Sequence, residues 1–526
     1  MSERKVSTGE TISLIVRSLK FVWPYWPQIL IKLLLSFIGI GIILFLPWPL
    51  KFLIDYVVMG LPVGSSPAPI PPYIQPFVDL LYGMTPFEIV WMVIAVSLLG
   101  IVLIGSFGIG IAHNTADGTL AQGLDTATQS ENLANESSSR VSGLLGLFEY
   151  RYQLRTTHRF NHQLRSLVFR RLLGLPMTRF SDDSVGDAVY RVMYDTPAIS
   201  KICYDILVVP ICSLFLIAVI IWTMQYSFAS VPSLVLLAWL AAPLVLVSSF
   251  LMTGAARRRS LASRKAGANT TATVEEGMSN IRAVQSLGAH DRQRDEFERD
   301  SKESFSRYRS FVWMNVMLVG LQATIACGLM IYVFFDIAEA IIDGRMTPGD
   351  SGIVWAYFGQ LLINTLALGA LWFKLQDNLI GMRRVFQIVD QQTDRERHGH
   401  ETLKTVRDGL SMDHVSYTYP DGTQALSDIS LDARVGEMIA LVGATGSGKT
   451  TLSYLIPAFI QPTEGRVLID GIDTRTLAVD NLRDLVSFVF QEPAVFDDTV
   501  ANNLRLGNPD ATDLELESAA STAGAL

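Results

Sequence analysis

The sequence has few cysteines and few charged residues for its length. Only three Cys occur among 526 residues, at positions 203, 212 and 327, which excludes a disulfide-stabilised scaffold. Charged residues make up 17% of the chain and apolar residues 49%, whereas about a quarter of an ordinary soluble domain is charged. The net charge of −8 gives no electrostatic reason to expect nucleic acid as a partner. This composition excludes a mainly disordered chain and indicates a membrane protein with a water-soluble part.

Long runs without Asp, Glu, Lys or Arg predict the membrane spans. A crossing helix needs about 20 mostly apolar residues, because the hydrocarbon layer is about 30 Å thick. Five such runs cover residues 33–50, 89–116, 206–256, 310–335 and 351–373. The third run is too long for one crossing and predicts two spans that turn near Gln225 to Pro232. The total is six spans. Buried helices of a large soluble protein would be the alternative, and a signal peptide would be the alternative for the first run.

The distribution of Lys and Arg predicts the orientation of the spans. Basic residues favour the cytosolic side, and the N-terminal stretch up to Lys32 carries five of them, whereas the loop from Phe52 to Glu88 carries none. Both termini are therefore expected in the cytosol. The expected location is the plasma (cell inner) membrane, as a multi-pass protein.

The composition also predicts the domain division. We expect an N-terminal cytosolic arm at 1–28 and a six-span domain at 29–375. That domain includes two largely helical intracellular segments, 117–204 and 257–309. A linker follows at 376–408, and a partial nucleotide-binding domain at 409–526. The Ser/Asn/Gly-rich stretch 118–143 predicts a loop.

A phosphate-binding motif begins the soluble part. The apolar run 437–442 predicts a strand, GATGSGKT follows at 443–450, and TLSYLIPAFI predicts a helix. This is the G-x-x-x-x-G-K-[ST] pattern in its strand–loop–helix setting. Backbone N–H groups of such a loop surround phosphate oxygens, with the lysine, here Lys449, on the β- and γ-phosphates and the hydroxyl of Thr450 on Mg²⁺. A glycine-rich turn that binds nothing is the alternative. The predicted nucleotide-binding residues in this segment are Gly443, Ala444, Thr445, Gly446, Ser447, Gly448, Lys449, Thr450 and Thr451.

Six spans with long cytosolic helices, followed by this motif, resemble an ATP-binding cassette (ABC) exporter of the half-transporter type. The resemblance implies a six-helix membrane domain followed by an α/β P-loop cassette, with ATP and Mg²⁺ as cofactors. It implies that Tyr419 stacks on adenine, although a strand-edge tyrosine is the alternative. It implies that Gln491 is the catalytic glutamine of the Q-loop and a second Mg²⁺ ligand. Short coupling helices are implied around Phe180 and Ala289.

The family's signature loop, Asp-Glu strand, D-loop and switch histidine do not follow Gln491, and no His follows His414. We therefore expect a C-terminally truncated copy of a transporter that binds ATP and scarcely hydrolyses it. The expected function is one exporter subunit, which pairs with a second half-transporter in a homodimer or heterodimer within the lipid bilayer. The alternative is a non-hydrolysing membrane regulator or a dominant-negative fragment, and an ATP-gated channel is not distinguished by sequence.

The sequence does not identify the transported substrate, for which the resemblance allows lipids, drugs or peptides. Asn315, Gln322, Gln360 and Asn364 are candidates for lining the path, or for bonding neighbouring helices. Tryptophans near the predicted span ends predict interface anchors. They are Trp23, Trp26, Trp48, Trp91 and Trp372. His398 and His400 lack further ligands, so no structural metal is predicted.

Overall fold

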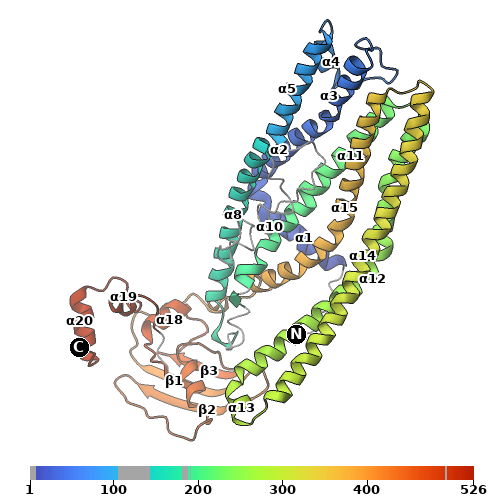
Figure 1. Ribbon diagram of the computed structural model, residues 1–526. Coiled ribbons are helices and arrows are strands. Elements are labelled where there is room, and N and C mark those ends of the chain that lie inside the picture. The colour runs from blue at the N-terminus through green and yellow to red at the C-terminus, as the bar shows by residue number, and fades with distance from the viewer. Residues whose placement is uncertain (1–7, 105–142, 180–187, 190, 492–494, 526) are drawn as a thin grey trace. The chain divides into compact units, whose positions relative to one another are not determined.

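The computed structural model describes residues 8–104, 143–179, 188–189, 191–491 and 495–525 (Figure 1). The chain divides into two compact units. The helical unit consists of Met1–Leu172 and Val185–Asp390, and the sheet unit consists of Leu173–Ser184 and Gln391–Leu526. The predicted loop 118–143 and the predicted coupling helix around Phe180 lie almost entirely outside the described residues.

Six helical segments of the described chain are long and apolar enough to cross a membrane, as predicted. They are Gly9–Val58, Pro86–Leu103, Arg191–Ser227, Pro232–Ser279, His290–Ile342 and Pro348–Gly369. The turn expected near Gln225 to Pro232 is confirmed, because one helix ends at Ser227 and the next begins at Pro232. Proline suits this first position of a helix, where its missing N–H would have had no partner.

Shorter helices build up the first part of the helical unit. They are α1 (Thr8–Val22), η1 (Trp23–Tyr25), α2 (Trp26–Phe45), α3 (Pro47–Phe52), η2 (Leu53–Val58), α4 (Gln75–Leu81), α5 (Pro86–Ile104) and α8 (Gly143–Leu173). The chain continues through η4 (Arg191–Asp195), α10 (Pro197–Cys203), η5 (Tyr204–Val208) and α11 (Val209–Ser227).

Two long helices run side by side, α12 (Pro232–Ser279) and α14 (His290–Ile342) (Figure 1). The short helix α13 (Ile281–Ser286) joins them, and the predicted coupling residue Ala289 is the N-cap of α14. The helix α15 (Pro348–Val389) packs on α11 and α12. The apolar core of the unit gathers residues from α2, α11, α12 and α15, for example Leu44, Ile220, Leu234 and Tyr357.

Trp48 is not an interface anchor, so that prediction is wrong. Its side chain is 1% exposed and its indole N–H donates to the hydroxyl of Tyr357 at 2.9 Å. The Trp48 side chain is therefore part of the packed interior of the helical unit. Trp23, Trp26 and Trp91 are more than half exposed.

Two buried lysines of the helical unit are paired with carboxylates. Lys51 lies between Asp55, at 3.0 Å, and Asp350, at 2.5 Å, and all three side chains are at most 1% exposed. Thr347 donates its hydroxyl to Asp55 at 2.7 Å and its N–H to Asp350 at 2.9 Å. Lys32 is likewise buried and pairs with Glu149 on α8 at 2.5 Å. Such pairing is required because a lone charge in a low-dielectric interior is very costly.

The sheet unit contains a four-stranded antiparallel sheet in the order β2-β1-β3-β4. The strands are β1 (Gly409–Thr418), β2 (Gln424–Arg434), β3 (Glu464–Ile469) and β4 (Ile472–Asp473). Its helices are η3 (Met177–Arg179), α16 (Asp394–Arg397), α17 (Lys449–Leu455), α18 (Val479–Leu485), α19 (Val500–Arg505) and α20 (Asp513–Thr522). Val415, Leu455 and Val467 are fully buried between the sheet and α17.

Two local predictions around the phosphate-binding motif are wrong. Residues 437–442 form no strand, and Met438 and Val442 are 96% and 88% exposed. A strand exists only through hydrogen bonds to a neighbour, and this segment pairs with none of the four described strands. The helix predicted to run to 460 ends at Leu455, because Pro457 lacks the N–H that a continuing helix needs.

Candidate functional site

The loop Gly443–Thr450 requires glycine at two points. Gly446 and Gly448 have φ angles of 84° and 89°, a region that side chains rarely allow. A Cβ on Gly448 would also lie 2.7 Å from the carbonyl oxygen of Ala425 on β2. The glycines therefore let the loop turn tightly against the start of β2 before α17 begins.

Lys449 folds back over this loop. Its ammonium donates to the carbonyl oxygens of Gly443 and Ala444, each at 2.8 Å, and to the hydroxyl of Ser447 at 3.4 Å. Within the described part of the chain, the amide groups of Thr445, Gly446 and Gly448 donate to no partner. The loop thus presents a lysine ammonium and several free backbone donors, which is the donor set that a triphosphate needs.

Tyr419 lies directly beside this loop. It follows β1, and its hydroxyl lies 2.9 Å from the hydroxyl of Thr451, a buried residue of α17. The turn after Tyr419 is fixed by Asp421, whose carboxylate accepts from the N–H of Thr423 at 2.9 Å. This hydrogen bond lowers the pKa of Asp421. The structure therefore places Tyr419 against the start of α17, next to the loop.

Thr450 and Gln491 are both exposed. Thr450 lies in the first turn of α17. Gln491 directly follows the segment Val486–Phe490. No hydrogen bond joins Gln491 to the loop within the ranges that the structure covers. Thr450, Gln491 and nucleotide oxygens are of the oxygen-ligand type that Mg²⁺ prefers. The residues present thus fit Mg²⁺ bound together with ATP.

No group of three or more His, Cys, Asp or Glu side chains that could hold a metal ion occurs among the described residues. His398 is buried and has a structural role. Its Nδ1 lies 2.7 Å from the carbonyl oxygen of Asp394, and its Nε2 lies 3.3 Å from the side-chain nitrogen of Gln461. These contacts hold α16 and Gln461 together within the sheet unit.

The polar residues of the spans differ in their surroundings. Gln322 on α14 donates to the hydroxyl of Ser249 on α12 at 2.9 Å, so it bonds a neighbouring helix. Gln360 and Asn364 are buried one turn apart on α15, and Asn364 donates to the carbonyl oxygen of Gln360 at 2.8 Å. Asn315 is exposed.

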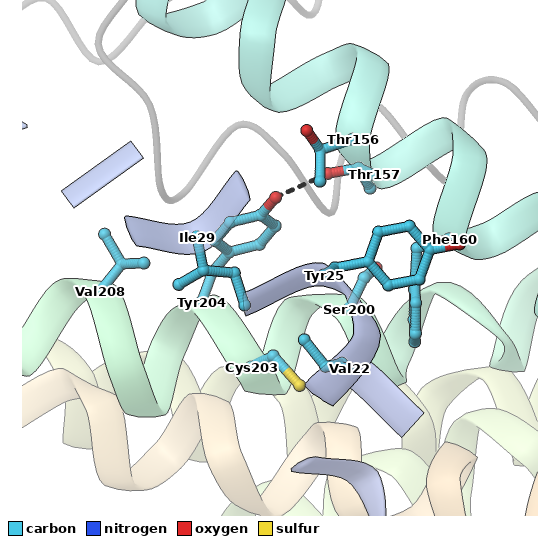
Figure 2. A pocket seen from close by; sticks show the side chains of 10 residues that line it. All are labelled: Val22, Tyr25, Ile29, Thr156, Thr157, Phe160, Ser200, Cys203, Tyr204 and Val208. Carbon is cyan, nitrogen blue, oxygen red and sulfur yellow. Dashed lines mark hydrogen bonds between the residues drawn. The ribbon is translucent and has the colours of Figure 1, made fainter. Parts of the chain in front are cut away.

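Figure 2 shows a small pocket in the helical unit. Residues of α1, η1, α2, α8, α10 and η5 line it: Val22, Tyr25, Ile29, Thr156, Thr157, Phe160, Ser200, Cys203, Tyr204 and Val208. The hydroxyls of Thr157 and Tyr204 lie 3.1 Å apart and satisfy each other. The wall therefore offers mostly carbon surface, and none of the predicted site residues reaches it.

Two family models match the chain. The model described as "ABC transporter transmembrane region" matches residues 141–366, and the model described as "ABC transporter" matches residues 426–525. The second match begins within β2 and covers the phosphate-binding loop and Gln491. Together the two matches join a membrane part and an ATP-binding part in one chain.

Curated relatives include two lipid A-core flippases. The ATP-dependent lipid A-core flippase of Methylobacillus flagellatus is 29% identical over 374 residues, which are 70% of this chain and 61% of that protein. The ATP-dependent lipid A-core flippase 1 of Colwellia psychrerythraea is 26% identical over 68% of this chain and 61% of that protein. The chain thus spans about three fifths of the length of the curated relatives it matches.

A solved structure has the same fold. It is described as a bacterial Atm1-family ABC exporter with ATP bound, and it matches with a TM-score of 0.68 at 21% identity. The match covers 95% of this chain and 77% of that chain. The predicted fold class, a six-helix membrane domain followed by a P-loop cassette, is confirmed.

Proposed function

Because this chain belongs to the ABC transporter family and has the fold of an ABC exporter, we propose that it couples ATP binding to export of a lipid-like amphiphile. The observation that carries this proposal is the loop Gly443–Thr450, with its free backbone donors and the ammonium of Lys449. The relatives' names, which describe ATP-dependent lipid A-core flippases, support a lipid rather than a drug or a peptide as the substrate.

The proposed nucleotide site uses the residues predicted from the sequence. Residues Gly443 to Thr451 surround the phosphates, and the ammonium of Lys449 exchanges the carbonyl oxygens of Gly443 and Ala444 for phosphate oxygens. Tyr419 stacks on the adenine. When bound, Mg²⁺ supplies positive charge to the β- and γ-phosphates. Thr450 and Gln491 orient that ion, and Gln491 is the proposed catalytic glutamine.

The proposed assembly is a dimer of half-transporters, either a homodimer or a heterodimer, in the plasma membrane with both termini in the cytosol. The proposed domains are the arm 1–28, the six-span domain 29–375, the linker 376–408 and the nucleotide-binding domain from 409 onward. The positive residues of the N-terminal arm support this orientation.

The test is binding and transport by the full chain reconstituted in lipid. If the proposal is correct, Mg·ATP binds the chain, and Lys449→Ala weakens that binding by about tenfold or more. Vesicles with the chain then move a labelled lipid between leaflets only with ATP, and labelled drugs and peptides serve as competing substrates. A folded chain that binds no Mg·ATP contradicts the proposal. Binding without movement of any substrate favours a regulator over an exporter.

A further inference from the structure

The position of Gln491 depends on side-chain packing rather than on sheet hydrogen bonds. The segment Val486–Phe490, which ends next to Gln491, is not part of the described four-stranded sheet. Strands obtain their position from ladders of backbone hydrogen bonds. The segment Val486–Phe490 is instead positioned by the packing of its side chains.

Four aromatic rings hold the segment against α17. We call Tyr454, Phe459, Phe488 and Phe490 the aromatic cluster. The rings of Phe459 and Phe490 stack with centroids 5.8 Å apart and planes inclined by 18°, and Phe459 meets Phe488 at 5.3 Å. Tyr454 on α17 contacts both Phe459 and Phe488, at 6.0 and 5.6 Å. Thr450 and Gln491, the two proposed Mg²⁺ ligands, therefore lie on two segments that the aromatic cluster joins.

Arg483 holds the central ring of this cluster. Its guanidinium carbon lies 5.3 Å from the centre of the Phe459 ring, close enough for a cation–π contact. The same guanidinium donates to the carbonyl oxygens of Pro457 at 3.4 Å and Ala458 at 3.5 Å. Arg483 thus fixes both the backbone just before Phe459 and the face of its ring.

Asp394 in turn fixes Arg483. Its carboxylate accepts from Arg483 at 2.8 Å, and the Asp394 side chain is only 13% exposed. The N–H of Asp394 donates to the carbonyl oxygen of Gly174 at 2.7 Å. Gly174 directly follows α8, the helix of the first intracellular segment. One residue therefore contacts both that segment and the arginine that supports the aromatic cluster.

We propose that Arg483, locked by Asp394, is the positioning residue that sets Gln491 relative to Thr450 through the aromatic cluster. This inference rests on the proposed function, in which Gln491 and Thr450 hold Mg²⁺ with ATP. Arg483 itself touches neither nucleotide nor metal. It acts through Phe459 and Phe490, so its loss loosens the metal site and leaves the phosphate loop intact.

The chain offers a matched control. Arg395 of α16 pairs with Asp480 of α18 at 2.8 Å. This ion pair joins the same two helices as the pair of Asp394 with Arg483. The Arg395 side chain is 76% exposed. Arg395→Gln therefore removes an α16–α18 ion pair without disturbing the aromatic cluster.

The experiment measures ATP affinity of the full chain in lipid, with Mg²⁺ and with EDTA, for Arg483→Gln, Asp394→Asn and Arg395→Gln. Arg483→Gln and Asp394→Asn reduce the gain in affinity that Mg²⁺ gives by about tenfold, the lower end for residues that support metal ligands. The ATP affinity of Arg483→Gln and Asp394→Asn in EDTA stays at the wild-type value. Arg395→Gln keeps the wild-type affinity both with Mg²⁺ and with EDTA. Arg483→Lys keeps the charge but loses the planar fork, and it falls between wild type and Arg483→Gln.

A second readout separates this inference from the proposed function. Hydrogen exchange at residues 487–491 becomes faster in Arg483→Gln and Asp394→Asn, and not in Arg395→Gln. Phe459→Leu keeps an apolar side chain but removes the ring, and it also makes exchange at residues 487–491 faster. It provides the test without a change of charge if Arg483→Gln and Asp394→Asn misfold. If Gln491→Ala leaves the Mg²⁺ effect intact, the proposed role of Gln491 fails, while faster exchange still supports the positioning by Arg483. Equal exchange and equal Mg²⁺ dependence in Arg483→Gln and Arg395→Gln overturn the inference.

Discussion

The ammonium nitrogen of Lys51 lies 2.5 Å from a carboxylate oxygen of Asp350, although 299 positions separate the two residues in the chain. The contact joins α3, near the end of the first span, to the first turn of α15. Asp55 is the second partner of Lys51, and it also accepts from the N–H of Gly349 at 3.0 Å. Every charge in this group is buried and has several partners.

Lys51→Ala is expected to destabilise the helical unit by about 3–5 kcal/mol, the usual result of leaving buried charges unpaired. The substitution leaves the carboxylates of Asp55 and Asp350 buried without their cation. Asp350→Asn costs less, because Asp55 still pairs with Lys51. Thermal unfolding of the chain in detergent measures both. Lys302→Ala, which breaks an exposed pair with Glu298, serves as the control and leaves the unfolding temperature unchanged. An equal effect of Lys51→Ala and Lys302→Ala contradicts this account.

Lys449→Ala is expected to weaken ATP binding by about tenfold or more, since a hydrogen bond to a charged group contributes about 1.5–3 kcal/mol. Lys449→Arg restores the charge but not the compact ammonium that fits between the carbonyl oxygens of Gly443 and Ala444. It therefore rescues binding only in part. Titration with a fluorescent ATP analogue measures the three affinities. Unchanged affinity in Lys449→Ala would show that the loop does not hold the phosphates.

Gly446→Ala and Gly448→Ala form a matched pair at similar positive φ angles. A Cβ on Gly446 meets nothing within 4 Å, so this variant suffers only the backbone strain of about 1–2 kcal/mol. A Cβ on Gly448 approaches the carbonyl oxygen of Ala425 to 2.7 Å and a methyl of Leu426 to 2.8 Å. Gly448→Ala is therefore the more destabilising of the two. Urea unfolding of the sheet unit within the full chain, followed by hydrogen exchange, ranks them. The reverse order would refute the close approach of β2 to the loop.

Stability is expected to depend on pH through His414. Nδ1 of its ring lies 2.6 Å from the carboxylate of Asp428, and this hydrogen bond raises the pKa of His414 above its usual range. A raised pKa means that the folded state favours the protonated ring. The stabilisation is complete below about pH 6.5, the unfolded value, and it is lost as the pH rises through the folded pKa. Unfolding temperatures of wild type and His414→Gln between pH 5 and 9 test this: the difference shrinks as the pH rises. A difference that grows with pH would reverse the sign and exclude the mechanism.

The membrane spans could be predicted from the sequence because their cause is local. A charge-free run of sufficient length has few stable locations other than a bilayer, and the six spans predicted from the five runs correspond to the six candidate spans of the described chain. The prediction for Trp48 failed because its burial depends on Tyr357, a residue of a distant helix. The phosphate loop could be predicted because its function needs a contiguous pattern, whereas residues 437–442 depend for strand structure on partners from elsewhere.

The support of Gln491 could not be predicted from the sequence. Asp394, Phe459 and Arg483 lie far apart in the chain, and no spacing connects them. The only signal in the sequence is the alternation of Phe488 and Phe490 before Gln491, which places both rings on one side of an extended segment. The sequence does not show that Phe488 and Phe490 contact Phe459, because that contact depends on the tertiary structure.

The paired helices α12 and α14 give the helical unit a mechanical property. At 1.5 Å per residue, the 53 residues of α14 measure about 80 Å, well beyond the roughly 30 Å of a hydrocarbon layer. A rigid rod of that length amplifies rotation, so a tilt of about 5° at one end moves the other by about 7 Å. Because α13 joins the ends of α12 and α14, any tilt of this helix pair within the membrane would displace the end that carries Ala289 the most.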